Sequence, residues 1–210
     1  MVHKTFVGRG GELETLEAHL QEALEGRGRV VLITGEAGIG KTMLVEHFRD
    51  QVLSHYPEVR FAGAECDRPI GEMDVGALSP YAPFKALIAQ LVNQERERGE
   101  HWALAYLKEV GPSWLGVIPG LGDLLTAVGE TGAFVLKRRQ EGPETMAGGA
   151  GQMGQEQMFQ QAVNTFKNIA TRHNPLVLFV DDWHWADDSS TNLLFHLARQ
   201  MGDSRILFLA

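Results

Sequence analysis

One stretch, residues 35–42, constrains this sequence more than any other. It reads Gly-Glu-Ala-Gly-Ile-Gly-Lys-Thr, fits the pattern G-x-x-x-x-G-K-[ST], and directly follows the apolar run 30–34. Glycines at this spacing let the backbone wrap closely around an anion with its N–H groups pointing inward. Residues 42–53 carry apolar side chains at helical spacing, so the loop should end at the positive N-terminal end of a helix. The sequence therefore predicts a strand, a phosphate-binding loop and a helix.

The loop also predicts a ligand class, a nucleoside triphosphate. Lys41 would bring its positive charge to the phosphates and contribute to catalysis. Thr42 would place its hydroxyl on a magnesium ion that bridges the outer phosphates. The residues predicted to contact the nucleotide in this segment are Gly35, Glu36, Ala37, Gly38, Ile39, Gly40, Lys41, Thr42 and Met43.

A second pattern far downstream complements the loop. Residues 176–180 read Leu-Val-Leu-Phe-Val, an apolar run of strand length, and Asp181 and Asp182 follow directly. An apolar strand ending in an acid is typical of a Walker B segment when a phosphate loop stands upstream. We predict that Asp181 reaches the magnesium shell and that Asp182 polarises an attacking water.

The composition indicates a globular protein and argues against some classes of partner. The 210 residues are 44% hydrophobic and 22% charged, the profile of a globular domain with a core. The net charge of −8 argues against a general nucleic-acid surface, because phosphate backbones need a basic stripe. A single cysteine, Cys66, cannot form an internal disulfide, which favours a reducing compartment. The sequence shows neither a signal-peptide core nor a membrane-length apolar run, so we expect a cytoplasmic protein without membrane contact.

Apolar spacing along the chain alternates between helix and strand, as in an α/β domain. We expect one domain over residues 1–210, with residues 99–155 forming a helical and glycine-rich insertion. A side chain within 187–190 should cap the helix that follows. The expected helices cover 13–24, 42–53, 156–170, a segment from 83 to at least 92 and one after 190, and the expected strands cover 30–34, 59–66, 176–180 and 205–210.

Three adjacent rings follow the paired acids, with His184 between Trp183 and Trp185. Such a cluster could bind a metal or stack on a base. Rings of this size bury a large apolar area, however, and we expect them to pack against the sheet edge.

Several of these segments are similar to a known family. The chain resembles the AAA-like ATPase domain of STAND-type signalling NTPases, as found in maltose-regulator-like transcription activators and in cyclase-linked multidomain ATPases. The resemblance spans nearly the whole chain. It is carried by Phe6-Val7-Gly8-Arg9 with Glu12-Leu13, the loop 35–42, Tyr81-Ala82-Pro83-Phe84, the run from Leu178 to Asp182, and His184-Trp185-Ala186-Asp187.

The resemblance implies a fold, the P-loop NTPase three-layer αβα sandwich with a mostly parallel sheet of the additional-strand class. The strand at 205–210 would lie between strands 30–34 and 176–180. Members of that family continue with a polar sensor, another core strand and a small helical lid. We therefore expect these 210 residues to be C-terminally incomplete. The edge of strand 30–34 would then be uncovered, which favours self-association.

The resemblance also implies ligands and partners. It places Phe6, Val7, Gly8 and Arg9 beside the adenine and sugar of a nucleotide. The implied cofactors are ATP or ADP and Mg²⁺. The implied partners are other domains of a larger chain or a signalling protein, with no direct nucleic-acid contact by this segment.

Three functions fit these features. A regulatory nucleotide switch with slow hydrolysis is favoured by the resemblance and by Asp182, which is shorter than the glutamate usual in motor ATPases. A turning-over enzyme, such as a motor ATPase or a small-molecule kinase, is the alternative. An interaction module with a vestigial loop is disfavoured because the loop residues are intact. The sequence has no Asn-Lys-x-Asp guanine-reading motif, so ATP is favoured over GTP.

Overall fold

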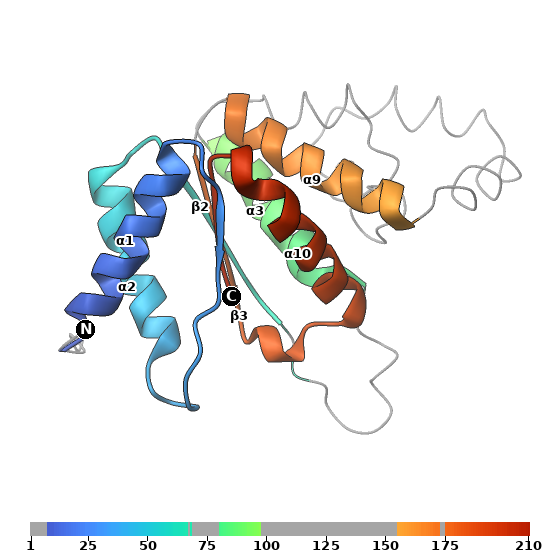
Figure 1. Cartoon of the computed structure of the whole chain (residues 1–210). Helices are drawn as coiled ribbons and strands as arrows, with labels where there is room; N and C mark the ends of the chain where they lie inside the picture. The colour runs from blue at the N-terminus through green and yellow to red at the C-terminus, as the bar shows by residue number, and fades with distance from the viewer. Residues whose placement is uncertain (1–7, 67, 69–79, 98–154, 173–174) are drawn as a thin grey trace, which may run out of the picture.

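The computed structural model describes residues 8–66, 68, 80–97, 155–172 and 175–210 (Figure 1). Phe6, Val7 and the predicted insertion up to residue 154 lie outside these ranges. The elements are α1 (Gly10–Leu24), β1 (Arg29–Val31), α2 (Lys41–His55), β2 (Arg60–Glu65), α3 (Ala82–Glu97), α9 (Gln155–Arg172), β3 (Leu176–Asp181), the short 3₁₀ helix η1 (Trp183–Trp185), α10 (Asp188–Gln200), a second 3₁₀ helix η2 (Met201–Asp203) and β4 (Ile206–Leu209).

The strands form one four-stranded parallel sheet in the order β1-β4-β3-β2. The prediction that the strand at 205–210 lies between the other two is confirmed. β1 is shorter than the predicted strand 30–34, because its paired residues match only Leu207–Leu209 of β4. Beyond the strand, the Ile33 N–H still donates to the Ala210 carbonyl at 2.7 Å.

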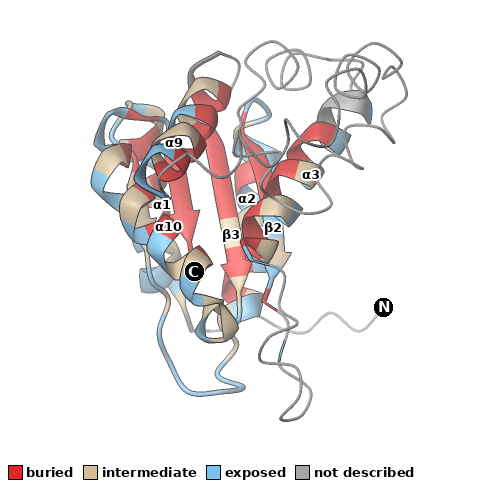
Figure 2. Cartoon of the chain, turned by 90° about the vertical axis from the view of Figure 1, so that its right-hand side faces the viewer, coloured by how far each residue is buried: buried red, intermediate tan, exposed pale blue. Residues whose placement is uncertain are grey.

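Helices cover both faces of the sheet, with α1 and α2 on one face and α3, α9 and α10 on the other (Figure 1). This arrangement follows from strands that are apolar on both sides, as expected for a buried parallel sheet. In β3, Leu176, Leu178 and Val180 pack toward α3, α9 and α10, whereas Val177 packs toward α1 and α2. Figure 2 shows β3 as buried along most of its length.

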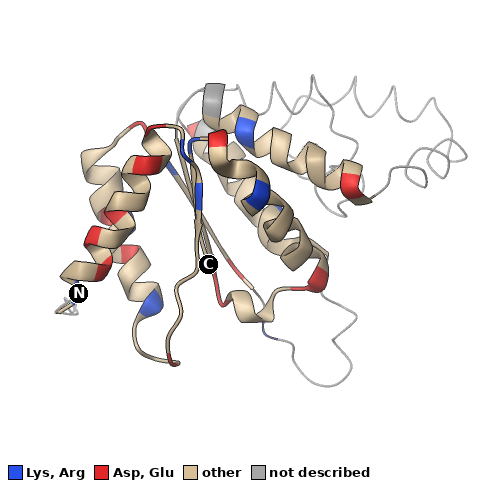
Figure 3. Cartoon of the chain, viewed as in Figure 1, with Lys and Arg blue, Asp and Glu red and all other residues tan. Residues whose placement is uncertain are grey.

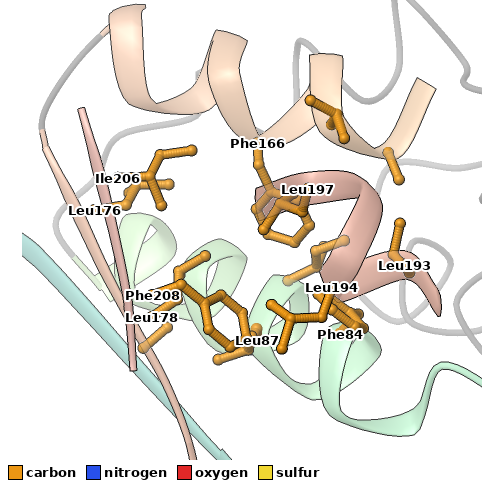
Figure 4. Close-up of a cluster of buried hydrophobic side chains, with 14 of the residues drawn as sticks. Phe84, Leu87, Phe166, Leu176, Leu178, Leu193, Leu194, Leu197, Ile206 and Phe208 are labelled. Atoms are coloured by element: carbon orange, nitrogen blue, oxygen red, sulfur yellow. The ribbon is translucent and has the colours of Figure 1, made fainter. Parts of the chain in front are cut away.

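The larger core cluster has an aromatic centre. Phe84 of α3, Phe166 of α9 and Phe208 of β4 are each 0% exposed, and Figure 4 shows them converging from three elements. The ring centroid of Phe84 lies 6.2 Å from that of Phe166 and 6.0 Å from that of Phe208. Burying each such ring contributes on the order of 2–3 kcal/mol. These rings fix α3 and α9 to the middle of the sheet.

Gly28 allows the chain to enter β1 past the segment that precedes β4. A Cβ atom at this position would lie 2.4 Å from both the Met201 carbonyl oxygen and the Ser204 hydroxyl oxygen. Only glycine fits such a close approach. The start of β1, which leads into the phosphate loop, is thereby packed closely against the segment before β4.

The outer edge of β2 is covered by two glutamines of α3. The Gly63 N–H donates to Gln90 Oε1 at 2.5 Å, and Gln94 Nε2 donates to the Phe61 carbonyl at 2.8 Å. An uncovered edge strand is a template for pairing with another chain. The two side chains satisfy the backbone groups that a further strand would otherwise take.

Candidate functional site

The loop between β1 and α2 contains two glycines in backbone conformations that other residues rarely adopt. Gly38 has a φ of 78° and Gly40 a φ of 89°, in the left-handed region that favours glycine. Gly40 is the N-cap of α2, and its carbonyl accepts the Leu44 N–H at 3.0 Å. The first turn of α2 carries no acidic residue. The positive end of the helix dipole is therefore not neutralised by a side chain of its own first turn.

Lys41 folds back over the loop. Its Nζ donates to the carbonyl oxygens of Gly35 at 2.9 Å and Glu36 at 3.2 Å. These contacts are exposed, so the charge lies at the surface and not in the core. Anionic phosphate oxygens are stronger acceptors for an ammonium group than neutral carbonyls.

Arg9 joins the N-terminal segment to the same loop. Its guanidinium donates to the Gly40 carbonyl at 3.5 Å and also to the Ile39 carbonyl. Gly8 precedes it with a φ of 90°. Of the segment that the resemblance assigns to the nucleotide, the structure therefore places Arg9 against the phosphate loop.

The predicted magnesium ligands meet directly. The Thr42 hydroxyl donates to Asp181 Oδ2 at 2.6 Å, although the two residues are 139 positions apart. Thr42 is the second residue of α2, and Asp181 is the last residue of β3. Oxygen donors of this kind suit Mg²⁺, which prefers carboxylate, hydroxyl and water ligands. The donor set therefore fits the ion that the loop implies.

Asp182 leaves the strand in an unusual conformation. Its φ of 52° and ψ of 38° lie in the left-handed region, which costs most residues about 1–2 kcal/mol and is best tolerated by Asn and Asp. Its N–H donates to Asp181 Oδ1 at 2.9 Å. The carboxylate is half-exposed and lies 3.8 Å from His184 Nδ1. The two acids thus point into different surroundings.

The three rings after Asp182 divide between core and solvent. The prediction that they pack against the sheet is confirmed for Trp183 and Trp185, which both contact the larger core cluster. It is wrong for His184, whose side chain is 64% exposed. Its ionisable ring lies at the solvent side of the turn, 4.8 Å from the Trp185 ring by centroid. Arg68 lies over the same Trp185 ring, with its Cζ 5.6 Å from the centroid.

Asp187 has a structural role, as predicted for this group of residues. Its carboxylate caps α10 by accepting the Ser190 N–H at 2.9 Å and the Ser190 hydroxyl at 2.5 Å. It also lies near Lys85, whose pKa is lowered by burial and partly restored by the charge of Asp187. Burial likewise raises the pKa of the nearby Tyr81 hydroxyl. Asp187 therefore caps α10 and also lies near α3.

A cleft of about 340 Å³ opens beside the Thr42–Asp181 pair. The sequence reasoning missed Glu65, which is level with Asp181 in the β2–β3 register, so carboxylates gather where these strands end (Figure 3). The signal was available, because the ends of neighbouring parallel strands meet at one edge of a sheet. The cleft is lined by Thr42, Val45, Glu46, Arg49, Phe61, Gly63, Ala64, Glu65, Gln90, Phe179 and Asp181.

Comparison with known proteins identifies a family. A family model described as an AAA ATPase domain matches residues 5–209. Neither the curated proteins nor the solved structures yield a significant match. The matched range includes the phosphate loop, the Thr42–Asp181 pair and the turn at Asp182.

Proposed function

Because this chain belongs to the family of AAA ATPase domains, we propose that it is a nucleotide switch domain. Membership of the family implies binding and hydrolysis of ATP. In our proposal the domain binds ATP or ADP with Mg²⁺, hydrolyses ATP slowly, and reports its nucleotide state to a larger signalling or transcription regulator of the STAND type. All 210 residues would belong to this one domain, with residues 99–155 as an insertion.

The Thr42–Asp181 contact is the observation that supports this proposal best. It brings a hydroxyl and a carboxylate together at 2.6 Å, at the point where the phosphate loop becomes a helix. A phosphate-bound magnesium ion needs oxygen ligands at that point. When bound, the ion would neutralise charge on the outer phosphates.

The remaining roles are assigned to this chain's own groups. The loop N–H groups and Lys41 would hold the phosphates, and Arg9 would brace the loop through the Ile39 and Gly40 carbonyls. Asp182 would orient and polarise the attacking water. Its side chain is short and half-exposed, which supports slow hydrolysis and a switching role over rapid turnover.

The proposed partners follow from the switch role. They are other domains of a larger chain or a signalling protein, and a second copy of this chain at the β1 edge. Direct nucleic-acid binding by this segment is not part of the proposal, since the net charge is −8. The proposed location is the cytoplasm. Among the helices that the structure describes, none is both long and apolar enough to cross a membrane.

Calorimetric titration with ATP, with and without Mg²⁺, tests the proposal. We expect magnesium-dependent binding that is reduced about tenfold in Thr42→Ala, because the hydroxyl ligand is lost. Thr15→Ala is the matched control, since the Thr15 hydroxyl contacts only its own helix, at the Gly11 carbonyl, in the bonds described. Failure of the wild-type protein to bind ATP would support a vestigial loop and refute the switch.

Turnover measurements separate the switch from the alternative enzymes. We expect phosphate release slower than once per second, well below typical enzyme rates of about 10 s⁻¹. Rapid release would indicate a turning-over ATPase. Transfer of phosphate to an acceptor other than water would indicate a small-molecule kinase.

A further inference from the structure

We propose that Trp183 is a positioning residue that holds Asp182 in its left-handed turn, and that the hydrolytic step depends on this ring. The inference deepens the proposed function, because it rests on Asp182 acting on the attacking water. Trp183 itself is partly buried and packs against the core cluster, and the proposal gives it no contact with the nucleotide or with the attacking water.

The carboxylate of Asp182 has little to hold it through its own contacts. The described partner of its side chain is His184 Nδ1, at 3.8 Å and largely exposed to solvent. Screening by water makes an exposed pair of this kind weak. The direction in which the carboxylate points must therefore come chiefly from the backbone at residue 182.

That backbone is held by the residue that follows it. The ring of Trp183 makes edge-to-face contacts with Phe84 of α3, at 6.2 Å and 87° between ring planes, and with Phe208 of β4, at 6.0 Å and 89°. Edge-to-face pairs are favoured by the ring quadrupoles and have a defined orientation. The two partners come from different elements and are both 0% exposed, so they form a rigid seat.

Two backbone hydrogen bonds close the turn that contains Trp183. The Trp185 N–H donates to the Asp182 carbonyl at 2.9 Å, and the Ala186 N–H donates to the Trp183 carbonyl at 2.8 Å. A left-handed residue with a Cβ atom persists only where its surroundings determine it. Without the Trp183 ring in this position, Asp182 would relax toward ordinary φ values and its carboxylate would point in a different direction.

The first test replaces the ring and measures single-turnover hydrolysis and ATP affinity. We expect Trp183→Leu to lower the rate of hydrolysis roughly 10- to 100-fold, as for other small misplacements of a reacting group. The Kd for ATP with Mg²⁺ should change less than about twofold, because Lys41, Thr42 and Asp181 are not altered. Trp183→Phe keeps an aromatic ring at this position and should recover most of the rate.

Phe166→Leu is the matched control for loss of an aromatic ring from this cluster. Phe166 packs on Phe84, at 6.2 Å, on α9 and away from the turn. We expect it to lower Tm by roughly 3–8 °C without a comparable loss of rate. Equal rate losses in Phe166→Leu and Trp183→Leu would overturn the proposal, since a general loss of packing would then explain both.

A double variant asks whether Trp183 acts through Asp182. If it does, adding Trp183→Leu to Asp182→Asn should cause no further loss of rate, because the group that the ring positions is already gone. A further loss of about tenfold or more in the double variant would overturn the proposal.

Hydrogen exchange tests the turn independently of hydrolysis. Trp183→Leu should speed exchange of the Trp185 and Ala186 amides at least severalfold, whereas Phe166→Leu should leave both unchanged. Unchanged exchange in Trp183→Leu would overturn the positioning role. Equal hydrolysis by the wild-type protein and Asp182→Asn would instead refute the proposed role of Asp182, and the exchange result would still decide what Trp183 holds.

Discussion

The two sides of the candidate site are held in place by different forces. On the loop side, Thr42 and the ammonium group of Lys41 are exposed, and they are fixed by hydrogen bonds to Asp181 and to loop carbonyls. On the turn side, Asp182 has a weak side-chain partner and a partly buried neighbour, Trp183, that packs against the core. The loop side can therefore lose a side chain without loss of fold. The turn side cannot change at Trp183 without affecting the packing between α3 and the sheet.

The largest effect is expected on the loop side, from Lys41→Ala. Nucleotide affinity should fall about 100-fold or more, because charge-assisted hydrogen bonds to phosphate are lost. The circular dichroism spectrum and Tm should be unchanged, since the ammonium group is exposed and contacts only loop carbonyls among the described residues. Arg27→Ala is the control for loss of one positive charge, because the Arg27 side chain is exposed and pairs with Glu25. Wild-type affinity in Lys41→Ala would refute the loop assignment.

On the turn side, Asp182→Asn should separate hydrolysis from binding. The rate of hydrolysis should fall about 100-fold, because an amide cannot polarise the water as a carboxylate does. ATP affinity measured by calorimetry should stay within about twofold of the wild-type value. A parallel loss of affinity would show that the two sides of the site are not functionally distinct.

Asp181 contacts both sides of the site, because its carboxylate accepts hydrogen bonds from Thr42 and from the Asp182 N–H, and Asp181→Asn tests its role. It should weaken the magnesium dependence of ATP binding about tenfold, since a charged ligand near the ion becomes neutral. Titrations with and without Mg²⁺ measure this directly. A loss of the same size without Mg²⁺ would mean that Asp181 supports the loop itself and not the ion.

The smallest effect is expected on the stability of the protein at acidic pH, through the contact between Glu22 of α1 and Arg29 of β1. Hydrogen bonds from Arg29 hold the pKa of Glu22 below its usual range, and His19 contributes in the same direction. The carboxylate is therefore stabilising above its unfolded pKa near 4.5, and this stability is lost as pH falls through the lower folded value. Thermal unfolding between pH 7 and 3 should show a shallower acid limb in Glu22→Gln. An identical pH profile in that variant would show that the pair contributes no net stability.

The sequence predicted the elements and the loop well because their signals are local. The glycine pattern, the helical spacing of α2 and the apolar run before Asp181 are each contained in one short stretch. The central place of β4 followed from the family resemblance. Asp187 was one of four candidates for the cap of α10, and the choice among them needed the backbone geometry.

The features that the sequence did not predict depend on contacts between distant segments. Trp183, which follows the left-handed Asp182, packs on rings from α3 and β4, and the contact of Arg9 with the loop joins residues 31 positions apart. The exposure of His184 between two packed tryptophans also depends on the turn, since neighbours in a 3₁₀ turn point in different directions. Side-chain chemistry alone does not contain this information.

The two glutamines of α3 that cover the edge of β2 match the spacing of residues along a helix to the spacing along a strand. Gln90 and Gln94 are one helical turn apart, a rise of about 6 Å, and the backbone groups that they meet, at Gly63 and Phe61, are two strand residues apart, about 6.6 Å. Because these lengths are nearly equal, glutamines one helical turn apart can reach backbone groups two residues apart on the strand. α3 therefore has a fixed register along β2, and sliding it by a single turn would leave one backbone group without its glutamine. Polar side chains at the margin of a helix can thus specify alignment where the apolar core, which tolerates small shifts, specifies only proximity.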